Sequence, residues 1–90
     1  MIPEAFALTG RTALVSGAGA PDGIGFAAAR ALAQLGASVH VTGKSERVLQ
    51  RAEELGGVGH VLDLTDEASV ATLAASLGSL DILVNNAGMT

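Results

Sequence analysis

The sequence contains no cysteine, tyrosine or tryptophan, and Lys44 is its single lysine. Without cysteine, a disulfide framework and a thiolate metal site are both excluded. Nine acidic residues against five basic ones give a net charge of −4, so the basic surface that nucleic-acid binding requires is missing. No apolar run approaches the ~20 residues of a membrane span, and Glu4 stands where a signal peptide carries positive charge. We expect a cytoplasmic protein that binds neither nucleic acid nor membranes.

What is present favours a layered α/β structure. Ninety residues make one small domain or part of a larger one. The apolar fraction is 49%, yet Phe6 and Phe26 are the only aromatic residues and much of the remainder is alanine. This composition suits helices packed closely on a sheet better than an aromatic core.

Short apolar runs alternate with segments of helical periodicity along the chain. The apolar runs predict four strands, at residues 12–16, 38–42, 58–62 and 81–85. Three helices are expected between them, over 23–35, from Ser45 to 55, and over 66–77. Gly36 is expected to cap the first helix in the left-handed conformation, and Ser45 and Thr65 to cap the starts of the other two. The first helix is expected to bury Ile24, Ala28, Ala31, Leu32 and Leu35.

This β-α-β-α-β-α-β order predicts parallel strands joined by right-handed helical crossovers. The expected fold is the N-terminal half of a doubly wound (Rossmann) sheet with strand order 3-2-1-4. Residues 1–90 are then a single, partial dinucleotide-binding domain.

A glycine-rich loop follows the first predicted strand, in the stretch "SGAGAPDGIG". In a doubly wound fold such a loop binds a pyrophosphate, because glycines allow close backbone approach and helix N-terminal N–H groups meet the negative charge. The alternative is a glycine-rich turn without a ligand. The position of the loop between a first strand and its helix favours the binding interpretation.

The stretch "LTGRTALVSGAGAPDGIGFAAARALAQLGA" resembles the N-terminal part of the short-chain dehydrogenases/reductases, which carry T-G-x-x-x-G-x-G here. Ser16 takes the place of the threonine, and Gly17, Gly23 and Gly25 those of the three glycines. The spacing is two residues longer than in the family pattern, as if Pro21 and Asp22 lengthened the loop; aligning Gly19 instead restores the spacing but displaces the strand end. The resemblance places the pyrophosphate at Gly23, Ile24 and Gly25, and near Gly17, Gly19 and Asp22.

Two later stretches match the same family in the same order. "DLTD" at 63–66 resembles the segment after the third strand, where Asp63 would contact the adenine and Leu64 would lie beside it. "NNAG" ends the fourth strand, and the resemblance implies that it steadies the sheet and lines the ribose through Asn85, Asn86, Ala87 and Gly88.

The end of the second strand bears on the choice of cofactor. NAD-dependent doubly wound enzymes place an acid there to hold the ribose 2′-OH, whereas this chain has Gly43, Lys44 and Ser45. Lys44 and Ser45 can bind a 2′-phosphate by charge and hydrogen bond, with Arg47 as a further candidate or a solvated surface residue. We therefore favour NADP(H) over NAD(H), although Asp22 argues weakly against it.

The sequence does not favour a nucleoside-triphosphate loop or a histidine metal site. "GKS" at 43–45 would be a nucleoside-triphosphate loop if a glycine stood five positions earlier, but that residue is Ser38, inside a strand. His40 and His60 fall in separate predicted strands without the spacing of a metal site, so no metal is expected.

The resemblance also implies a reaction, hydride transfer between a nicotinamide and a carbonyl or alcohol, as in carbonyl and 3-oxoacyl-carrier-protein reductases. In the family a serine, a tyrosine and a lysine four residues after the tyrosine carry the proton chemistry and follow the NNAG segment. The 90 residues contain no tyrosine, and Lys44 belongs to the cofactor region, so we assign no catalytic residue here. We expect an N-terminal NADP(H)-binding segment of an oxidoreductase; the alternatives are a non-catalytic nucleotide-binding or self-associating fragment and an inert truncation product.

The fourth strand would then lie at a sheet edge, with Ile82, Leu83 and Val84 available for pairing. One face of the sheet would be covered by the third helix alone. We expect self-association or company from a separate C-terminal piece.

Overall fold

The computed structural model describes residues 7–18, 23–63 and 65–85. Four parallel strands form one sheet in the order β3-β2-β1-β4. The strands are β1 (Thr12–Ser16), β2 (Ser38–Gly43), β3 (Val58–Val61) and β4 (Ile82–Asn85), and the helices are α1 (Ile24–Gln34), α2 (Arg47–Leu55) and α3 (Glu67–Leu77). The predicted fold class and strand order are confirmed, with element bounds that differ by no more than two residues.

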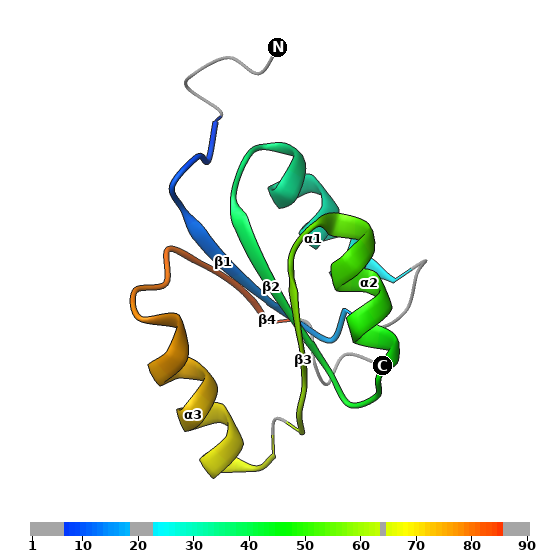
Figure 1. Ribbon diagram of the computed structural model, residues 1–90, viewed down its shortest axis with the longest axis vertical. Helices are drawn as coiled ribbons and strands as arrows, with labels where there is room; N and C mark the ends of the chain where they lie inside the picture. The colour runs from blue at the N-terminus through cyan, green and yellow to red at the C-terminus, as the bar shows by residue number, and fades with distance from the viewer. Residues whose placement is uncertain (1–6, 19–22, 64, 86–90) are drawn as a thin grey trace.

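The helices lie on both sides of the sheet, α1 and α2 on one side and α3 on the other (Figure 1). The core lies between the sheet and the α1–α2 layer. Its fully or almost fully buried members are small and aliphatic: Ala13, Val15, Ala18, Ala29, Val39, Val41, Val48 and Ala52. Short side chains allow the helices to approach the sheet closely, as the alanine-rich composition predicts.

The face of α1 that turns to the core agrees only in part with the prediction. Leu32 of the expected stripe is half-buried against the core. Gly25, Phe26 and Ala29 are buried, whereas Ile24 is 71% exposed and Ala31 is exposed as well. The apolar residues of this helix almost encircle it, so periodicity alone did not single out the stripe that packs on the sheet.

Of the three predicted caps, the one at Gly36 is confirmed and the two at helix starts are wrong. The N-cap of α2 is Glu46 rather than Ser45, and the Glu46 side chain makes no capping hydrogen bond. Gly36 has φ 100, and the N–H groups of Gly36 and Ala37 donate to Ala33 and Leu32 carbonyls, as expected for a left-handed glycine cap. The start of α3 was predicted wrongly: the N-cap is Asp66 rather than Thr65, because the Asp66 carboxylate accepts from the Ala68 and Ser69 N–H groups. Among the described residues, no helix is long and apolar enough to span a membrane.

Candidate functional site

Because all four strands are parallel, their carboxyl ends meet at one edge of the sheet. The predicted site residues that the structure describes gather there: Gly17 follows β1, Gly43 to Ser45 end and follow β2, Asp63 follows β3, and Asn85 ends β4. Gly23, Ile24 and Gly25 form the start of α1 at the same edge. Gly19, Asp22, Leu64, Asn86, Ala87 and Gly88 lie outside the described residues.

The chain leaves β1 through a turn at Gly17 whose backbone conformation favours glycine. Gly17 has φ 71, a left-handed conformation that side chains with a Cβ disfavour. The N–H groups of Gly17 and Ala18 both donate to the Thr42 carbonyl, at 2.9 and 3.1 Å. The start of the glycine-rich loop is thereby attached to the end of β2.

The N-terminus of α1 can receive an anion. Gly23 occupies the N-cap position without a side-chain cap, and no acidic residue lies in the first turn. Ile24 is 71% exposed at this end, while Gly25 is buried. The helix dipole at such a terminus favours negative charge, and here no carboxylate of the described first turn competes with a ligand.

At the ends of β2 and β3, a cation and a carboxylate lie close enough to interact. Lys44 and Ser45 are exposed. Hydrogen bonds from the backbone N–H and the hydroxyl of Thr65 are the largest causes that lower the pKa of the Asp63 carboxyl; desolvation opposes them, and the charge of Lys44 adds a smaller lowering. Ser45 also accepts a 3.4 Å hydrogen bond from the Arg47 N–H, although the N-cap position of α2 is Glu46.

Asn85 joins β4 to the centre of the sheet. The Ser16 hydroxyl lies 3.2 Å from the Asn85 Oδ1 and 3.4 Å from the Val84 carbonyl oxygen, so it donates across the β1–β4 boundary. Ser16 and Asn85 are partners in the strand register. This contact stabilises the strand end on which the NNAG segment begins.

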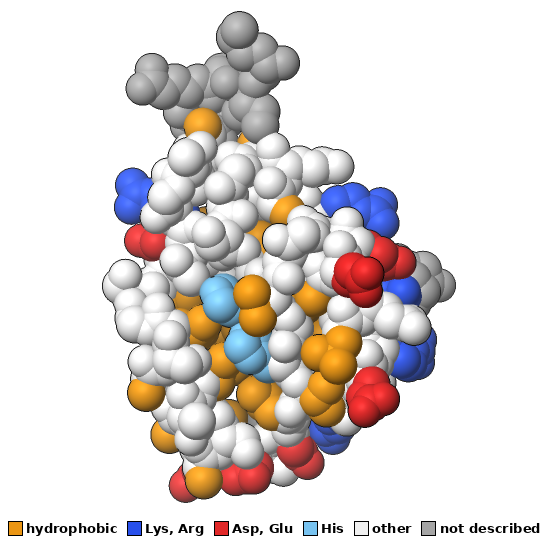
Figure 2. Space-filling model, viewed as in Figure 1, with side chains coloured by type: hydrophobic (Ala, Val, Ile, Leu, Met, Phe, Trp, Pro, Cys, Tyr) orange, Lys and Arg blue, Asp and Glu red, His pale blue; other side chains and the backbone are white. Residues whose placement is uncertain are grey.

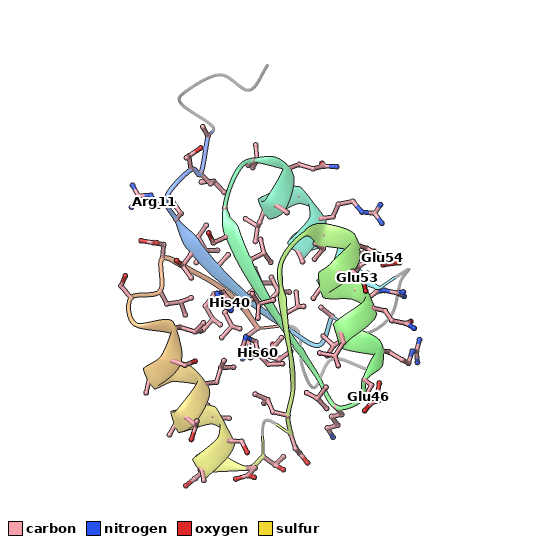
Figure 3. All side chains as sticks on the ribbon, viewed as in Figure 1. Arg11, His40, Glu46, Glu53, Glu54 and His60 are labelled. Carbon is pink, nitrogen blue, oxygen red and sulfur yellow. The ribbon has the colours of Figure 1, made fainter. Side chains whose placement is uncertain are left out.

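The structure also brings together two histidines that the sequence analysis treated separately. His40 Nδ1 and His60 Nε2 are 3.0 Å apart, and the rings stack with centroids 5.3 Å apart and an interplanar angle of 17°. Figure 3 shows them meeting between β2 and β3. Burial lowers the pKa of both rings, and the neighbouring His40 lowers that of His60 further. The sequence carried one signal for this contact: the expected strand order places β3 beside β2, and each histidine lies near the middle of its strand.

A hollow of about 450 Å³ lies between the end of β3 and α3. Its lining is mixed, with apolar side chains and three hydroxyls from α3: His60, Val61, Leu62, Ala68, Ser69, Thr72, Leu73 and Ser76. Figure 2 shows the histidines on this side of the molecule among hydrophobic side chains. Among the described residues of this lining, none is a carboxylate, lysine or arginine.

The groups at the carboxyl edge match the chemistry of a dinucleotide. A helix N-terminus without an acidic first turn suits a pyrophosphate, Lys44 and Ser45 supply a cation and a hydroxyl for a phosphate, and Asp63 supplies an acceptor for an amino group.

Comparisons with known proteins bear on the family of this chain. The sequence profile of the family described as "short chain dehydrogenase" matches residues 11–90. Oxidoreductase UcpA of Salmonella typhimurium is 43% identical over 91 residues, 91% of this chain and 34% of UcpA. 3-Oxoacyl-[acyl-carrier-protein] reductase FabG of Escherichia coli is 46% identical over 88 residues, 90% of this chain and 35% of FabG.

Among solved structures, the Pseudomonas aeruginosa RhlG/NADP active-site complex aligns with a TM-score of 0.82 and 38% identity. The alignment covers 99% of this chain and 39% of that one. The chain therefore spans about a third of the length of the curated relatives it matches.

Proposed function

The chain belongs to the short-chain dehydrogenase family, and on that basis we propose that its 90 residues are the NADP(H)-binding segment of an oxidoreductase acting on CH–OH groups. The complete enzyme would transfer a hydride between the nicotinamide and a carbonyl or alcohol. We propose that the complete enzyme reduces 3-oxoacyl thioesters, as a 3-oxoacyl-carrier-protein reductase does. The 46% identity to FabG supports this substrate class.

One observation carries the proposal, the gathering of the α1 N-terminus, Lys44, Ser45 and Asp63 at one edge of the sheet. In the proposed complex, the start of α1 faces the pyrophosphate through Gly23 to Gly25, with Gly17, Gly19 and Asp22 along the loop. Lys44 and Ser45, after Gly43, bind the 2′-phosphate. Asp63 and Leu64 contact the adenine, and Asn85 to Gly88 line the ribose.

The cofactor supplies the hydride when it is bound, and the residues of this chain bind and orient its adenine side. Because the 90 residues contain no tyrosine, the proton-transferring group proposed for the complete enzyme comes from outside them. Support for NADP(H) comes from the absence of an acid at Gly43 to Ser45 and from the similarity of this chain to RhlG in its complex with NADP.

A second candidate, favoured by the lack of tyrosine, is a nucleotide-binding or self-associating protein without catalysis. Such a protein binds NADPH but never oxidises it with any carbonyl compound, even at high protein concentration. An assay of NADPH oxidation with a short 3-oxoacyl thioester separates the two, provided that binding has first been measured.

Binding and cofactor choice are tested by fluorescence titration with NADPH and NADH. We expect the unmodified chain to prefer NADPH, and Lys44→Ala to weaken NADPH binding by about fivefold to tenfold, because one charge-assisted phosphate contact is lost. NADH binding should change little. Arg11→Ala is the matched control, because Arg11 precedes β1 at the opposite edge of the sheet.

A preference for NADH, or equal losses with both cofactors in Lys44→Ala, would contradict the assigned role of Lys44. A flat titration with both cofactors would reject the proposed function itself.

A further inference from the structure

The turn between β3 and α3 fixes the direction of one carboxylate. Asp63 Oδ1 accepts two hydrogen bonds from Thr65, at 2.9 Å from the backbone N–H and 2.8 Å from the hydroxyl. The Asp63 carbonyl accepts a further bond from the Asp66 N–H at 2.9 Å. Backbone and side chain of Asp63 are therefore both tied to the turn that follows.

The other carboxylate oxygen of Asp63 has a different environment. Within the part of the chain that the structure describes, no donor contacts Oδ2, and the residue is exposed at the carboxyl edge. A carboxylate is planar, so two donors on Oδ1 also set the direction of the Oδ2 lone pairs. Oδ2 is thereby presented outward as an acceptor for an amino group.

We propose that Thr65 is a positioning residue for the adenine end of the dinucleotide: its hydroxyl holds the Asp63 carboxylate so that Oδ2 accepts a hydrogen bond from the exocyclic amino group. The inference rests on the proposed function, in which Asp63 contacts the adenine. Thr65 itself touches no part of the cofactor in this arrangement. The sequence predicts Thr65 as the cap of α3, a role that Asp66 fills.

The ionisation of Asp63 supports the same arrangement. The backbone N–H of Thr65 is the largest cause that lowers the pKa of the Asp63 carboxyl, and the Thr65 hydroxyl is the next; desolvation opposes them and Lys44 adds a smaller lowering. Protonation adds an O–H donor to the carboxyl group, whereas the ionised carboxylate is acceptor-only. The hydroxyl therefore keeps Oδ2 available as an acceptor to a lower pH.

Two substitutions at one position isolate the hydroxyl. Thr65→Val keeps the β-branched shape and the backbone N–H bond but removes the hydroxyl bond, whereas Thr65→Ser keeps both bonds. Thr72→Val is the matched control, because the Thr72 hydroxyl donates to the Ala68 carbonyl within α3, away from Asp63.

The experiment measures two quantities on the full chain: the dissociation constant of NADPH at neutral pH, and the pKa of the Asp63 carboxyl by carbon-13 NMR without cofactor. In Thr65→Val we expect NADPH to bind about threefold to tenfold more weakly. The pKa of Asp63 should rise, because one of the two hydrogen bonds that lower it is lost. Thr65→Ser and Thr72→Val should match the unmodified chain.

A nucleotide with hypoxanthine in place of adenine gives the specific readout, since hypoxanthine lacks the exocyclic amino group. Thr65→Val should lose part of the preference for adenine, which a general loss of stability would not produce. The proposal is overturned if Thr65→Val binds NADPH as the unmodified chain does, or loses equal affinity for both nucleotides.

The two hypotheses fail in different ways. If Thr65→Val raises the pKa of Asp63 but no variant binds a dinucleotide, the Thr65–Asp63 contact stands and both the proposed function and the positioning role fall. If the unmodified chain binds NADPH and Thr65→Val does not weaken it, the proposed function stands and the positioning role alone is wrong.

Discussion

At the scale of single residues, the Asp66 carboxylate determines where α3 begins. It accepts hydrogen bonds from the Ala68 and Ser69 N–H groups at 3.2 and 3.4 Å, and from the Ser69 hydroxyl at 2.9 Å. The first-turn N–H groups of a helix otherwise lack an intrahelical partner. Asp66 thus contributes to the stability of the element that follows the proposed adenine contact.

We expect Asp66→Ala to lower the free energy of unfolding by about 1 kcal/mol, the usual cost of losing an N-cap. Urea unfolding followed by circular dichroism measures it. Glu67→Ala is the control, because Glu67 is exposed in the same turn and does not cap the helix. Equal effects of the two substitutions would show that Asp66 acts through its charge alone.

The neighbouring residues show what sequence reasoning could resolve at this scale. Thr65 and Asp66 are both good capping residues, so the sequence left the choice between them open to a one-residue error. The pattern D-x-T at 63–65 carried a usable signal for the bond from Thr65 to Asp63, since aspartate side chains commonly accept from the N–H two residues on. The Ser16–Asn85 contact depends on strand register, which the sequence did not supply.

At the scale of elements, the histidine pair links β2 to β3 directly upstream of Lys44 and Asp63. Both histidines face the side of the sheet on which α3 lies, with Leu14 of β1 and Val58 of β3 as register neighbours of His40. The part of α3 that faces His60 presents Ala68, Ser69, Thr72, Leu73 and Ser76, none of them charged.

This pair should make stability depend on pH. Burial lowers the pKa of both imidazoles in the folded chain. A histidine of the unfolded chain has a pKa of about 6.5, so below that pH the unfolded chain binds more protons than the folded chain. The stabilisation is fully present above that pH and is lost as the pH falls towards the folded values. We expect the urea midpoint to drop between pH 7.5 and 5, and to drop less in the His40→Gln/His60→Gln double variant. Parallel pH profiles would exclude the pair as the cause.

Hydrophobic periodicity predicts the strands of this chain better than it predicts the buried faces of its helices. The bounds of β1 and the strand order follow from short apolar runs and from the handedness of parallel crossovers. The buried face of α1 was predicted only in part: Leu32 packs against the core, but Ile24 does not. Apolar residues surround that helix, and the direction in which the chain crosses the sheet decides which stripe packs.

At the scale of the whole molecule, the two faces of the sheet are covered unequally. The α1–α2 face carries the core, whereas Leu83 on the α3 side is 61% exposed. β4 pairs with β1 along one side, and no strand in the part of the chain that the structure describes pairs along its other side. An apolar strand with an unpaired edge is a template for pairing with another chain.

We therefore expect the 90-residue chain to self-associate at micromolar concentration, as measured by sedimentation equilibrium. Leu83→Lys should shift the distribution of oligomers towards monomer, because it places a charge on the exposed sheet face beside the unpaired side of β4. Leu80→Lys is the control, since Leu80 is also exposed but precedes β4. A strictly monomeric and well-folded unmodified chain would contradict this expectation.

In the proposed function, the carboxyl edge of the sheet binds the adenine side of NADP(H). The most direct measurement is a two-dimensional proton–nitrogen NMR titration of the 90-residue chain with NADPH. We predict that the amide signals of Gly17, Gly23 to Phe26, Lys44, Ser45 and Asp63 move on binding, while those of Arg11 and Asp81 at the opposite edge stay in place. No shifts at saturating NADPH, or shifts confined to the opposite edge or to the outer surfaces of α1 and α2, would contradict the account.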